Sequence, residues 1–452
     1  MSQLIIGDVT ENSAKIWVRG IANNESTTTL TAQVTLKSDL LNITQNLSIY
    51  KHDYFIGVLE LTDLNPADSG FIRMLYTVEI TFKDIARVPI GFPARGSFNT
   101  SPRFKPDVSF LHGCNFIQTN ENDGKRVFKN LTAIRKKEKS QLMIHGGNQI
   151  YVDAPAPKQA IQSESYTTKY LQAWKSREAA EFLGRIANYS AINDHELYFR
   201  YANDVEYDYK PATYYLREAL PSYQLFQQAR NPNSYGENKL YYNFTCGEHA
   251  FFVLDTRTER YQFVKSNQKR QMIGEQQMEA LKSWLLEHKN NLKFIHSAVP
   301  FVTIKETDYS EYWSSEAFID QKNELLQFIK ENDIHHIIFL TGQANATLHS
   351  TLKLKKSNRE IVIHELMTGP LNMYEIGISN YDDFIWRQRT ITNQLDYEYH
   401  IQVANAELAP NVMSIHVDDK EVVFKSYSTK YDLEEDEIPQ VILSGSIPIT
   451  KE

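Results

Sequence analysis

The change of rhythm near residue 100 is the feature that most constrains the fold. Before it, apolar and polar residues alternate over short stretches, as in Ala14–Arg19 (AKIWVR) and Thr28–Leu36. Such alternation is typical of strands with one buried face, and several short strands joined by turns predict a β-sandwich over residues 1–100. After it, strands alternate with helices. This predicts an α/β domain of layered mixed sheets flanked by helices over residues 105–452.

The prediction of an α/β domain rests on apolar runs and amphipathic stretches after residue 105. The runs expected to be strands are Val108–Leu111, Gln141–His145, Tyr189–Ile192, Ala250–Leu254, Leu292–Val299 and His335–Leu340. The stretches expected to be helices, from their helical spacing of apolar or charged residues, are Arg126–Lys139, Tyr166–Ile186, Gln271–His288 and Ser315–Asn332. Residues 397–428 return to strand-like runs. A length of 452 residues also exceeds one ordinary core, which favours two or more domains.

Composition excludes several classes of protein. The net charge of −8 argues against general nucleic-acid binding, and two cysteines, Cys114 and Cys246, are too few for a disulfide framework. No stretch approaches 18 apolar residues, and the N-terminus lacks a basic start followed by an apolar core. Neither a membrane span nor a signal peptide is therefore expected. The sequence as written predicts a cytoplasmic protein, with export by a non-classical route as the alternative.

Polar side chains suited to metal chemistry, together with neutral amides, directly follow four of the expected strands. In chain order they are Cys114, then Asn148 and Tyr151, then Asp194 and His195, and finally Gln343 and Asn345. Sheets of α/β proteins bind ligands outside the carboxyl ends of their strands, so the four loops are expected to meet in one crevice. Each cluster alone is also explained by a helix cap or a strand-ending turn. The prediction therefore rests on the four clusters taken together, in their order along the chain.

This set and its surroundings resemble the alkaline phosphatase D-like (PhoD-like) family of metallophosphoesterases. The resemblance spans nearly the whole chain, and the order and spacing of its segments are more specific than any single segment. The segments are Ala14–Arg19, Leu61–Pro66, Gly96–Thr100, Leu142–Asp153, Asp255–Arg260, Gly274–Met278 and Leu340–Asn345. In that family a strand-end Cys, an Asp-x-x-Tyr pair, an Asp-His pair and a Gly-Asp-x-His pair surround two or more metal ions.

The resemblance implies roles for four residues that keep a suitable chemical type. Cys114, Tyr151 and Asp194 match metal ligands of the family, and Asp194 and His195 form its Asp-His pair. His195 matches the residue that steadies phosphate in the transition state. Members of the family usually carry an export signal, and none is expected here.

Three other ligand positions hold neutral amides. Asn148 replaces the bridging Asp, Gln343 replaces an Asp ligand and Asn345 replaces a His ligand. Two divalent ions about 4 Å apart repel each other by roughly 15–20 kcal/mol even at an effective dielectric constant of 20, and anionic ligands normally offset this repulsion. Without a strong cation, the thiol and the phenol also stay mostly neutral at pH 7. We therefore expect a two-metal Fe/Ca or Zn centre to be lost.

Weaker ligands remain conceivable at the same place. Amide carbonyls ligate calcium and magnesium, so the alternatives are no metal or one weakly bound Ca²⁺ or Mg²⁺. His145, His296 and His349 are candidate substitute ligands, each also explained as an ordinary core or surface histidine. Arg257 could bind the phosphate of a substrate, although a salt bridge or a loop anchor is the simpler reading of Arg257.

Three functions follow. The leading one is a PhoD-like scaffold with an impaired metal site, a pseudophosphatase or binding module for a phosphorylated small molecule or a protein partner, with no nucleic-acid or membrane partner. The alternative is an active phosphomonoesterase or phosphodiesterase with a rebuilt metal site, in which metal-bound hydroxide attacks and His195 stabilises the leaving oxygen. A metal-free reaction with Cys114 as nucleophile and His195 as base comes third.

Overall fold

The computed structural model describes most of the chain. The described residues are 2–66, 75–104, 106–118, 121–153, 163–263, 269–302, 311–343, 346–356, 359–372, 388–391, 397–404, 409–434 and 437–449. Asn345, one of the expected ligand positions, lies outside them. None of the helices within these ranges is long and apolar enough to cross a membrane.

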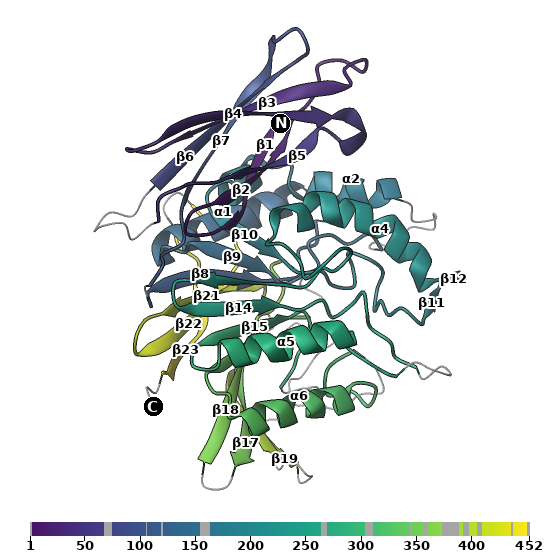
Figure 1. Cartoon of the computed structure of the whole chain (residues 1–452), viewed down its shortest axis with the longest axis vertical. Helices are drawn as coiled ribbons and strands as arrows, with labels where there is room; N and C mark the ends of the chain where they lie inside the picture. Colours follow the sequence, from purple (N-terminus) through teal and green to yellow (C-terminus); the bar gives the residue numbers. More distant parts are fainter. Residues whose placement is uncertain are drawn as a thin grey trace.

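Two antiparallel sheets form the first hundred residues (Figure 1). One has the order β1 (Gln3–Val9), β2 (Ala14–Arg19) and β5 (Ile56–Leu61), and the other has the order β4 (Asn42–Tyr50), β3 (Thr29–Lys37), β6 (Leu75–Lys83) and β7 (Pro89–Asn99). Burial alternates along β3, because every second side chain points to the same face. The predicted strands are therefore confirmed, whereas the predicted β-sandwich and the domain boundaries at 1–100 and 105–452 stay predictions.

Two larger mixed sheets form the rest of the core. The six-stranded sheet has the order β10 (Ala187–Ser190), β9 (Leu142–His145), β8 (Val108–Gly113), β21 (Asn411–Val417), β22 (Glu421–Ser428) and β23 (Val441–Pro448). The eight-stranded sheet has the order β13 (Tyr242–Cys246), β14 (His249–Val253), β15 (Lys293–Ser297), β16 (Ile337–Thr341), β18 (Arg359–Met367), β17 (Leu348–Lys356), β20 (Tyr397–Ala404) and β19 (Gln388–Ile391). Strands β8 to β10 are mutually parallel, as are β14, β15, β16 and β18.

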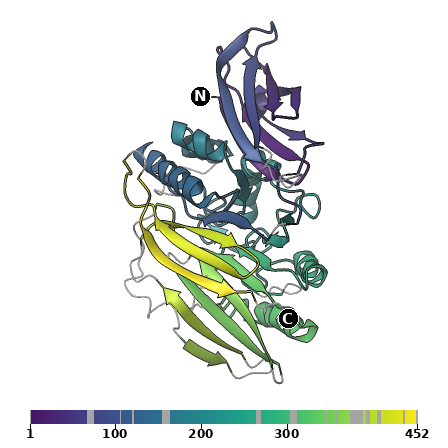
Figure 2. The same ribbon diagram turned by 90° about the vertical axis from the view of Figure 1, so that its left-hand side faces the viewer.

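The two large sheets pack face to face, with helices outside them (Figures 1 and 2). Between the sheets, the ring of Phe110 lies 5.4 Å from that of Phe251 and 5.1 Å from that of Phe294. Helices α1 (Glu121–Glu138), α2 (Ser163–Ala173), α3 (Arg177–Leu183) and α4 (Ala212–Phe226) share one buried apolar cluster with β8 and β9. Helices α5 (Glu275–Glu287) and α6 (Ile319–Asn332) share another with β14 to β18. The prediction of layered sheets flanked by helices is confirmed.

Several details of the secondary structure differ from the sequence prediction. Tyr166–Ile186 is not one helix, because Ser176 accepts a hydrogen bond from the backbone N–H of Ala179 and begins a new helix there. Helix α4 was not predicted, because tyrosines and an internal Pro221 obscure its period. Strands β17 and β18 were missed as well. Helices α5 and α6 begin four residues later than expected, at Glu275 and Ile319.

Trp17 joins the N-terminal strands to the helical layer. Its fully buried ring lies edge-on to Trp174, with 6.5 Å between centroids, and its indole N–H donates to the carbonyl of Leu225 at 2.9 Å. Trp17→Phe should lower the free energy of unfolding by about 1–3 kcal/mol, because the smaller ring leaves a void and the carbonyl loses its donor. Urea denaturation measures this loss. The exposed Phe92 provides the matched control, since Phe92→Ala should change stability by less than about 0.5 kcal/mol.

Candidate functional site

The strand-end residues come from adjacent parallel strands. Cys114 follows β8, Asn148 follows β9 and Asp194 follows β10, and the register pairs Gly113 with His145 and His145 with Ser190. These loops therefore leave the same edge of the six-stranded sheet. Gln343 follows β16 of the facing sheet. The Cys114 sulfur lies so close to Gly342 that a Cβ on residue 342 would overlap it. The loop after β8 and the loop after β16, which come from different sheets, are therefore in direct contact.

The loop backbones adopt left-handed conformations where the site forms. Asn115 and Asn148 have φ of +56°, and Gln343 has φ of +66°. Asn tolerates this region, whereas other non-glycine residues there are strained by about 1–3 kcal/mol. Gly147, with φ of +93°, also leaves no room for a Cβ beside Asn193. Left-handed backbone conformations are frequent at functional sites, and the side chains of the three residues meet here.

The Asn148 amide is the centre of the site. Its Oδ1 accepts the backbone N–H of His195 at 2.9 Å, and because that group can only donate, the orientation of the amide is fixed. Its Nδ2 then faces three oxygens: Asn115 Oδ1 at 3.2 Å, Asp194 Oδ1 at 3.0 Å and Gln343 Oε1 at 3.0 Å. An NH₂ group thus lies where converging oxygens would otherwise surround a cation.

A second chain of hydrogen bonds fixes the Gln343 amide. Arg257 Nε donates to Asn193 Oδ1 at 2.6 Å, so the Asn193 amide nitrogen must donate onward, and it contacts Gln343 Oε1. Gln343 Nε2 in turn donates to both oxygens of the Asp194 carboxylate at 3.3 Å. Every donor in this series of hydrogen bonds meets an acceptor, so the amide groups satisfy one another within the site.

Arg257 supplies the positive charge next to Asp194. Its guanidinium is fully buried, bonds to Glu311 and lies 3.7 Å from an Asp194 oxygen. Burial raises the pKa of Asp194, but the Arg257 cation, His195 and hydrogen bonds from Arg200 and Asn148 outweigh it, so this pKa lies well below its usual value. Asp194 is therefore an anion that a guanidinium already neutralises.

Glu196 organises the loop backbones beneath these side chains. Its carboxylate accepts the backbone N–H groups of Asn148, Gln149 and Asn193 at 2.5–3.0 Å. Burial raises its pKa to about 7, although the three hydrogen bonds lower it. The oxygens of the Glu196 carboxylate are therefore already hydrogen-bonded to backbone N–H groups.

The two other expected anionic ligands stay neutral. Burial raises the pKa of the Cys114 thiol to about 12. Burial and the nearby Asp194 carboxylate raise the pKa of the Tyr151 phenol well above its usual value. Without a bound cation both groups are therefore neutral at pH 7, and each must ionise to bind a metal ion well.

His195 keeps an ordered environment. Its Nδ1 lies 2.7 Å from Asp153 Oδ1, and its ring stacks on Tyr151 with 4.0 Å between centroids. Burial lowers the pKa of His195, but the Asp194 and Asp153 carboxylates raise it above the usual value overall. The Tyr151 hydroxyl and Asp153 Oδ2 are buried without a hydrogen-bond partner among the described residues.

The three candidate substitute histidines have partners or neighbours of their own. His145 Nε2 pairs with Asn188 Oδ1 at 2.9 Å, the His296 ring packs on His112 at 5.4 Å, and His349 Nε2 pairs with His364 Nδ1 at 3.0 Å. Across the described residues, no group of three or more His, Cys, Asp or Glu side chains could hold a metal ion. Arg260 lies 3.3 Å from Glu311 in an ion pair.

Several contributors to the network had no role in the sequence prediction. They are Asn115, Asp153, Asn193, Glu196 and Glu311. Three of them flank expected site residues directly, and this adjacency is the signal that could have found them. Glu311 is 54 residues from Arg257 in the chain, and no local pattern connects the two.

The comparisons with known proteins give one family and one shared fold. The family model described as PhoD-like phosphatase matches residues 113–422. A solved structure described as that of PhoD is 17% identical, with a TM-score of 0.72 over 100% of this chain and 92% of the other, which shows a shared fold. A β-glucuronidase from Bacteroides uniformis is 8% identical over 99% of this chain and 60% of its own, with a TM-score of only 0.25. No curated protein matches the chain.

Proposed function

Because the chain belongs to the PhoD-like phosphatase family, we propose that it is a phosphoesterase scaffold whose metal centre has been replaced by amides, and that it acts as a pseudophosphatase or binding module. The main support for this proposal is the position of the Asn148 amide nitrogen, which lies within 3.0–3.2 Å of three oxygens. An amide donates two hydrogens to neighbouring oxygens, whereas a carboxylate at this position would need a cation between itself and Asp194.

The ions that the family implies fit this site poorly. The amide nitrogens of Asn148 and Gln343 point toward the Asp194 carboxylate, and a metal ion would have to displace both of them. The Arg257 guanidinium already supplies the positive charge, and the Cys114 thiol is protonated at neutral pH. We therefore derive no catalytic step through a metal. One weakly bound Ca²⁺ or Mg²⁺ stays a prediction.

The ligand of such a module stays a proposal: a phosphorylated small molecule or a protein partner. We infer that Arg257 is an internal anchor, not a phosphate-binding residue, since it is buried and bonds to Glu311 and Asn193. His195 is the better candidate for contact with a ligand, because part of its side chain, 13% of the surface, is exposed.

The alternative is an active phosphoesterase, and one observation favours it. Tyr151, His195 and Asp153 keep an ordered stack and hydrogen bond, with a buried Tyr151 hydroxyl that has no partner in the described structure. A site without chemistry has no evident need for this arrangement. Catalysis by Cys114 as a nucleophile is less favoured, because its thiol donates to the carbonyls of Thr368 and Gly369 and burial raises its pKa.

Metal content and turnover of the unmodified protein test the proposal. Protein purified without chelators should contain less than one tightly bound divalent ion per chain by elemental analysis. Hydrolysis of p-nitrophenyl phosphate and bis-p-nitrophenyl phosphate should stay at background with Ca²⁺, Mg²⁺, Mn²⁺, Zn²⁺ or Fe²⁺, because no nucleophile is activated.

A restored variant is the positive control. Asn148→Asp, Gln343→Asp and Asn345→His together should gain both bound metal and hydrolysis, because they return two carboxylates and an imidazole. The proposal fails if the unmodified protein hydrolyses either substrate and Asp194→Ala abolishes that activity.

A further inference from the structure

A second cleft lies at the opposite end of strand β9 from the candidate site. Ser140 and Gln141 immediately precede β9 and line this cleft, whereas Asn148 follows the same strand. The four residues of β9 span about 13 Å, so the two places are separate. The cleft has a volume of about 250 Å³ and also includes Ser97 and Asn99 from the end of β7.

Four cations line this cleft: Arg135, Lys136, Lys139 and Arg185. Among the described lining residues there is no carboxylate. Arg185 forms an ion pair at 3.3 Å with Glu181, which belongs to α3 and is not part of the lining. Like charges so close together repel each other unless an anion lies between them.

Arg135 is the cation of this cleft whose hydrogen bonds are least satisfied. Its Nε is buried and has no hydrogen-bond partner in the described part of the chain, while its Nη1 reaches only the carbonyl of Arg185 at 3.3 Å. Burial lowers the pKa of Arg135, and the Arg185 cation lowers it further, against a smaller opposite effect of Glu181. A buried guanidinium N–H without an acceptor is costly, and the guanidinium keeps further N–H groups from which an oxyanion in the cleft could accept hydrogen bonds.

The end of helix α1 explains only part of this charge. Cations in the last turn of a helix interact favourably with its dipole, which accounts for Arg135 and Lys136. Arg185 belongs to another segment. Lys139 has φ of +53° just past the helix end, where glycine is usual because it is unstrained there. The strained lysine adds a fourth cation to the cleft.

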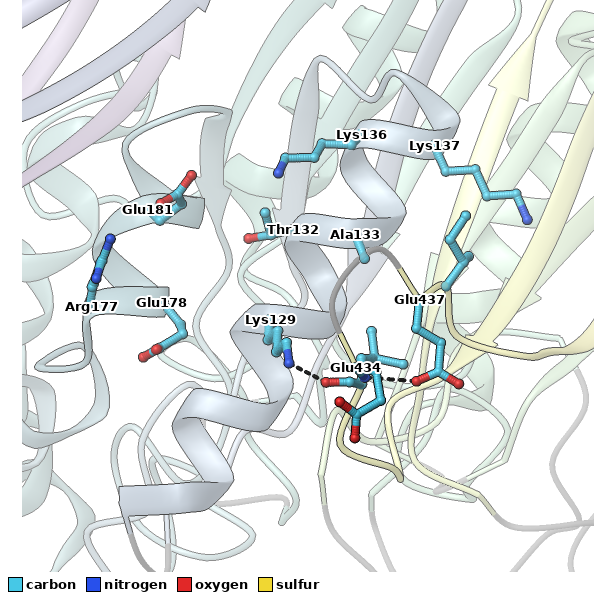
Figure 3. A pocket seen from close by; sticks show the side chains of 12 residues that line it. Lys129, Thr132, Ala133, Lys136, Lys137, Arg177, Glu178, Glu181, Glu434 and Glu437 are labelled. Carbon is cyan, nitrogen blue, oxygen red and sulfur yellow. Dashed lines mark hydrogen bonds between the residues drawn. The ribbon is translucent and has the colours of Figure 1, made fainter.

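A neighbouring groove shows the contrast. It has a volume of about 780 Å³ and runs along the same helix, with lysines on α1 and the carboxylates of Glu178, Glu181, Glu434 and Glu437 on the segments beside it (Figure 3). Its cations, which include Lys136 of the cleft, are matched by as many carboxylates, so the groove does not select for an anion. Figure 3 also shows the side chains of Lys136 and Lys137 pointing in opposite directions from α1, and Lys137 does not line the smaller cleft.

We propose that the cleft between α1, β7 and β9 is an accessory site for a small phosphate oxyanion such as pyrophosphate. Guanidinium groups match phosphate oxygens as paired donors, and the side chains of Ser140 and Asn99 can add neutral donors. The volume of 250 Å³ lies below the range of about 300–1,000 Å³ for drug-sized ligands, which suits a compact anion. This site does not depend on whether the candidate metal centre is active.

Calorimetric titration of the whole protein with pyrophosphate at near-physiological salt tests this site. We expect saturable 1:1 binding with a Kd of about 1 mM or tighter. Arg135→Gln and Lys139→Gly should each weaken binding about tenfold. Lys139→Gly should leave the melting temperature unchanged or raise it, because glycine relieves the left-handed strain. A loss of binding without a loss of stability separates a binding role from a structural one.

Lys137→Gln is the matched control, since it removes one charge from the same turn of α1 outside the cleft. It should weaken binding by less than about twofold. Equal effects of Lys137→Gln and Arg135→Gln would mean that pyrophosphate responds only to the general field of the helix, and the site would be rejected. Absence of saturable binding would reject it too, as would loss of binding in His195→Gln, which would locate the anion at the candidate site.

Discussion

Asn148→Asp should lower the free energy of unfolding by about 3–5 kcal/mol in the presence of a chelator, because it creates an uncompensated buried charge. The new carboxylate would replace an NH₂ group that now donates to Asp194 Oδ1 at 3.0 Å and to Gln343 Oε1 at 3.0 Å. Two carboxylates would then face each other across one hydrogen-bond length, and the Arg257 guanidinium near Asp194 is already shared with Glu311.

Divalent cations should reverse much of this loss. A cation between the two carboxylates would remove their repulsion, so adding Mg²⁺, Mn²⁺ or Ca²⁺ should raise the melting temperature of the variant as the ligand concentration exceeds Kd. The unmodified protein should respond little, since its amide occupies the same point. Thermal unfolding with and without chelator measures both effects.

Asn148→Ala is the control for lost hydrogen bonds. It removes the same donors without adding charge, but it also strains the backbone at φ of +56°. It should therefore cost about 2–6 kcal/mol, and it is distinguished from Asn148→Asp because it should not respond to cations. If Asn148→Asp is as stable as the unmodified protein in chelator, the amide does not substitute for a cation and the pseudophosphatase proposal loses its main support.

The sequence allows three of the four loops of the site to be placed, because one rule suffices for them. Parallel strands of one sheet end at the same edge, so Cys114, Asn148 and Asp194, which follow β8, β9 and β10, could be expected together before any coordinates. Gln343 follows β16 of the other large sheet, and the packing of the two sheets brings it to the same place. Apolar runs such as Ile337–Thr341, buried along their whole length, identify those strands without any knowledge of pairing.

The orientation of the amide groups in the site could not be predicted in the same way. The backbone N–H of His195 fixes the orientation of the Asn148 amide and so decides which of its atoms faces Asp194. Arg257, acting through Asn193, fixes the orientation of the Gln343 amide in the same way. These contacts join residues of several loops and carry no periodic signal. The sequence therefore indicates that three ligands were replaced, but only the structure indicates that two of the replacements hydrogen-bond to each other.

The pairing of Arg257 shows the same limit. Local sequence offers Glu259 as a partner, two residues away, yet the guanidinium bonds to Glu311. Glu259 instead pairs with Lys239 at 2.6 Å. Burial decides between them, because a fully buried guanidinium needs a carboxylate that is buried as well, and burial follows from the packing of distant elements.

Acid should destabilise the protein steeply between about pH 6.5 and pH 4, because several neutral histidines are buried. Burial lowers the pKa of His296 to about 3 and that of His145 to about 4. Burial lowers the pKa of His349 to about 3, with a further contribution from His364, whose own pKa burial lowers to about 4. In the unfolded chain these imidazoles bind protons near pH 6.5.

The direction follows from proton binding in the two states. Between the folded and unfolded pKa values the unfolded chain holds more protons, so the free energy of unfolding falls as pH falls, by about 1.4 kcal/mol per pH unit for each histidine. Above about pH 6.5 these groups contribute no slope. Four such groups give a loss of several kcal/mol by pH 5, which is comparable to the whole stability of a typical domain.

His296→Phe should make this dependence shallower by about 1.4 kcal/mol per pH unit. Its ring packs on His112 at 5.4 Å and its nitrogens have no hydrogen-bond partner among the described residues, so phenylalanine preserves the packing and removes only the proton site. Urea denaturation at half-unit steps from pH 7 to pH 5 measures the slope. The exposed His52 serves as control, and His52→Gln should leave the slope unchanged. An unmodified protein equally stable at pH 7 and pH 5 would contradict burial of these histidines in neutral form and, with it, the packing of the two large sheets on which the candidate site rests.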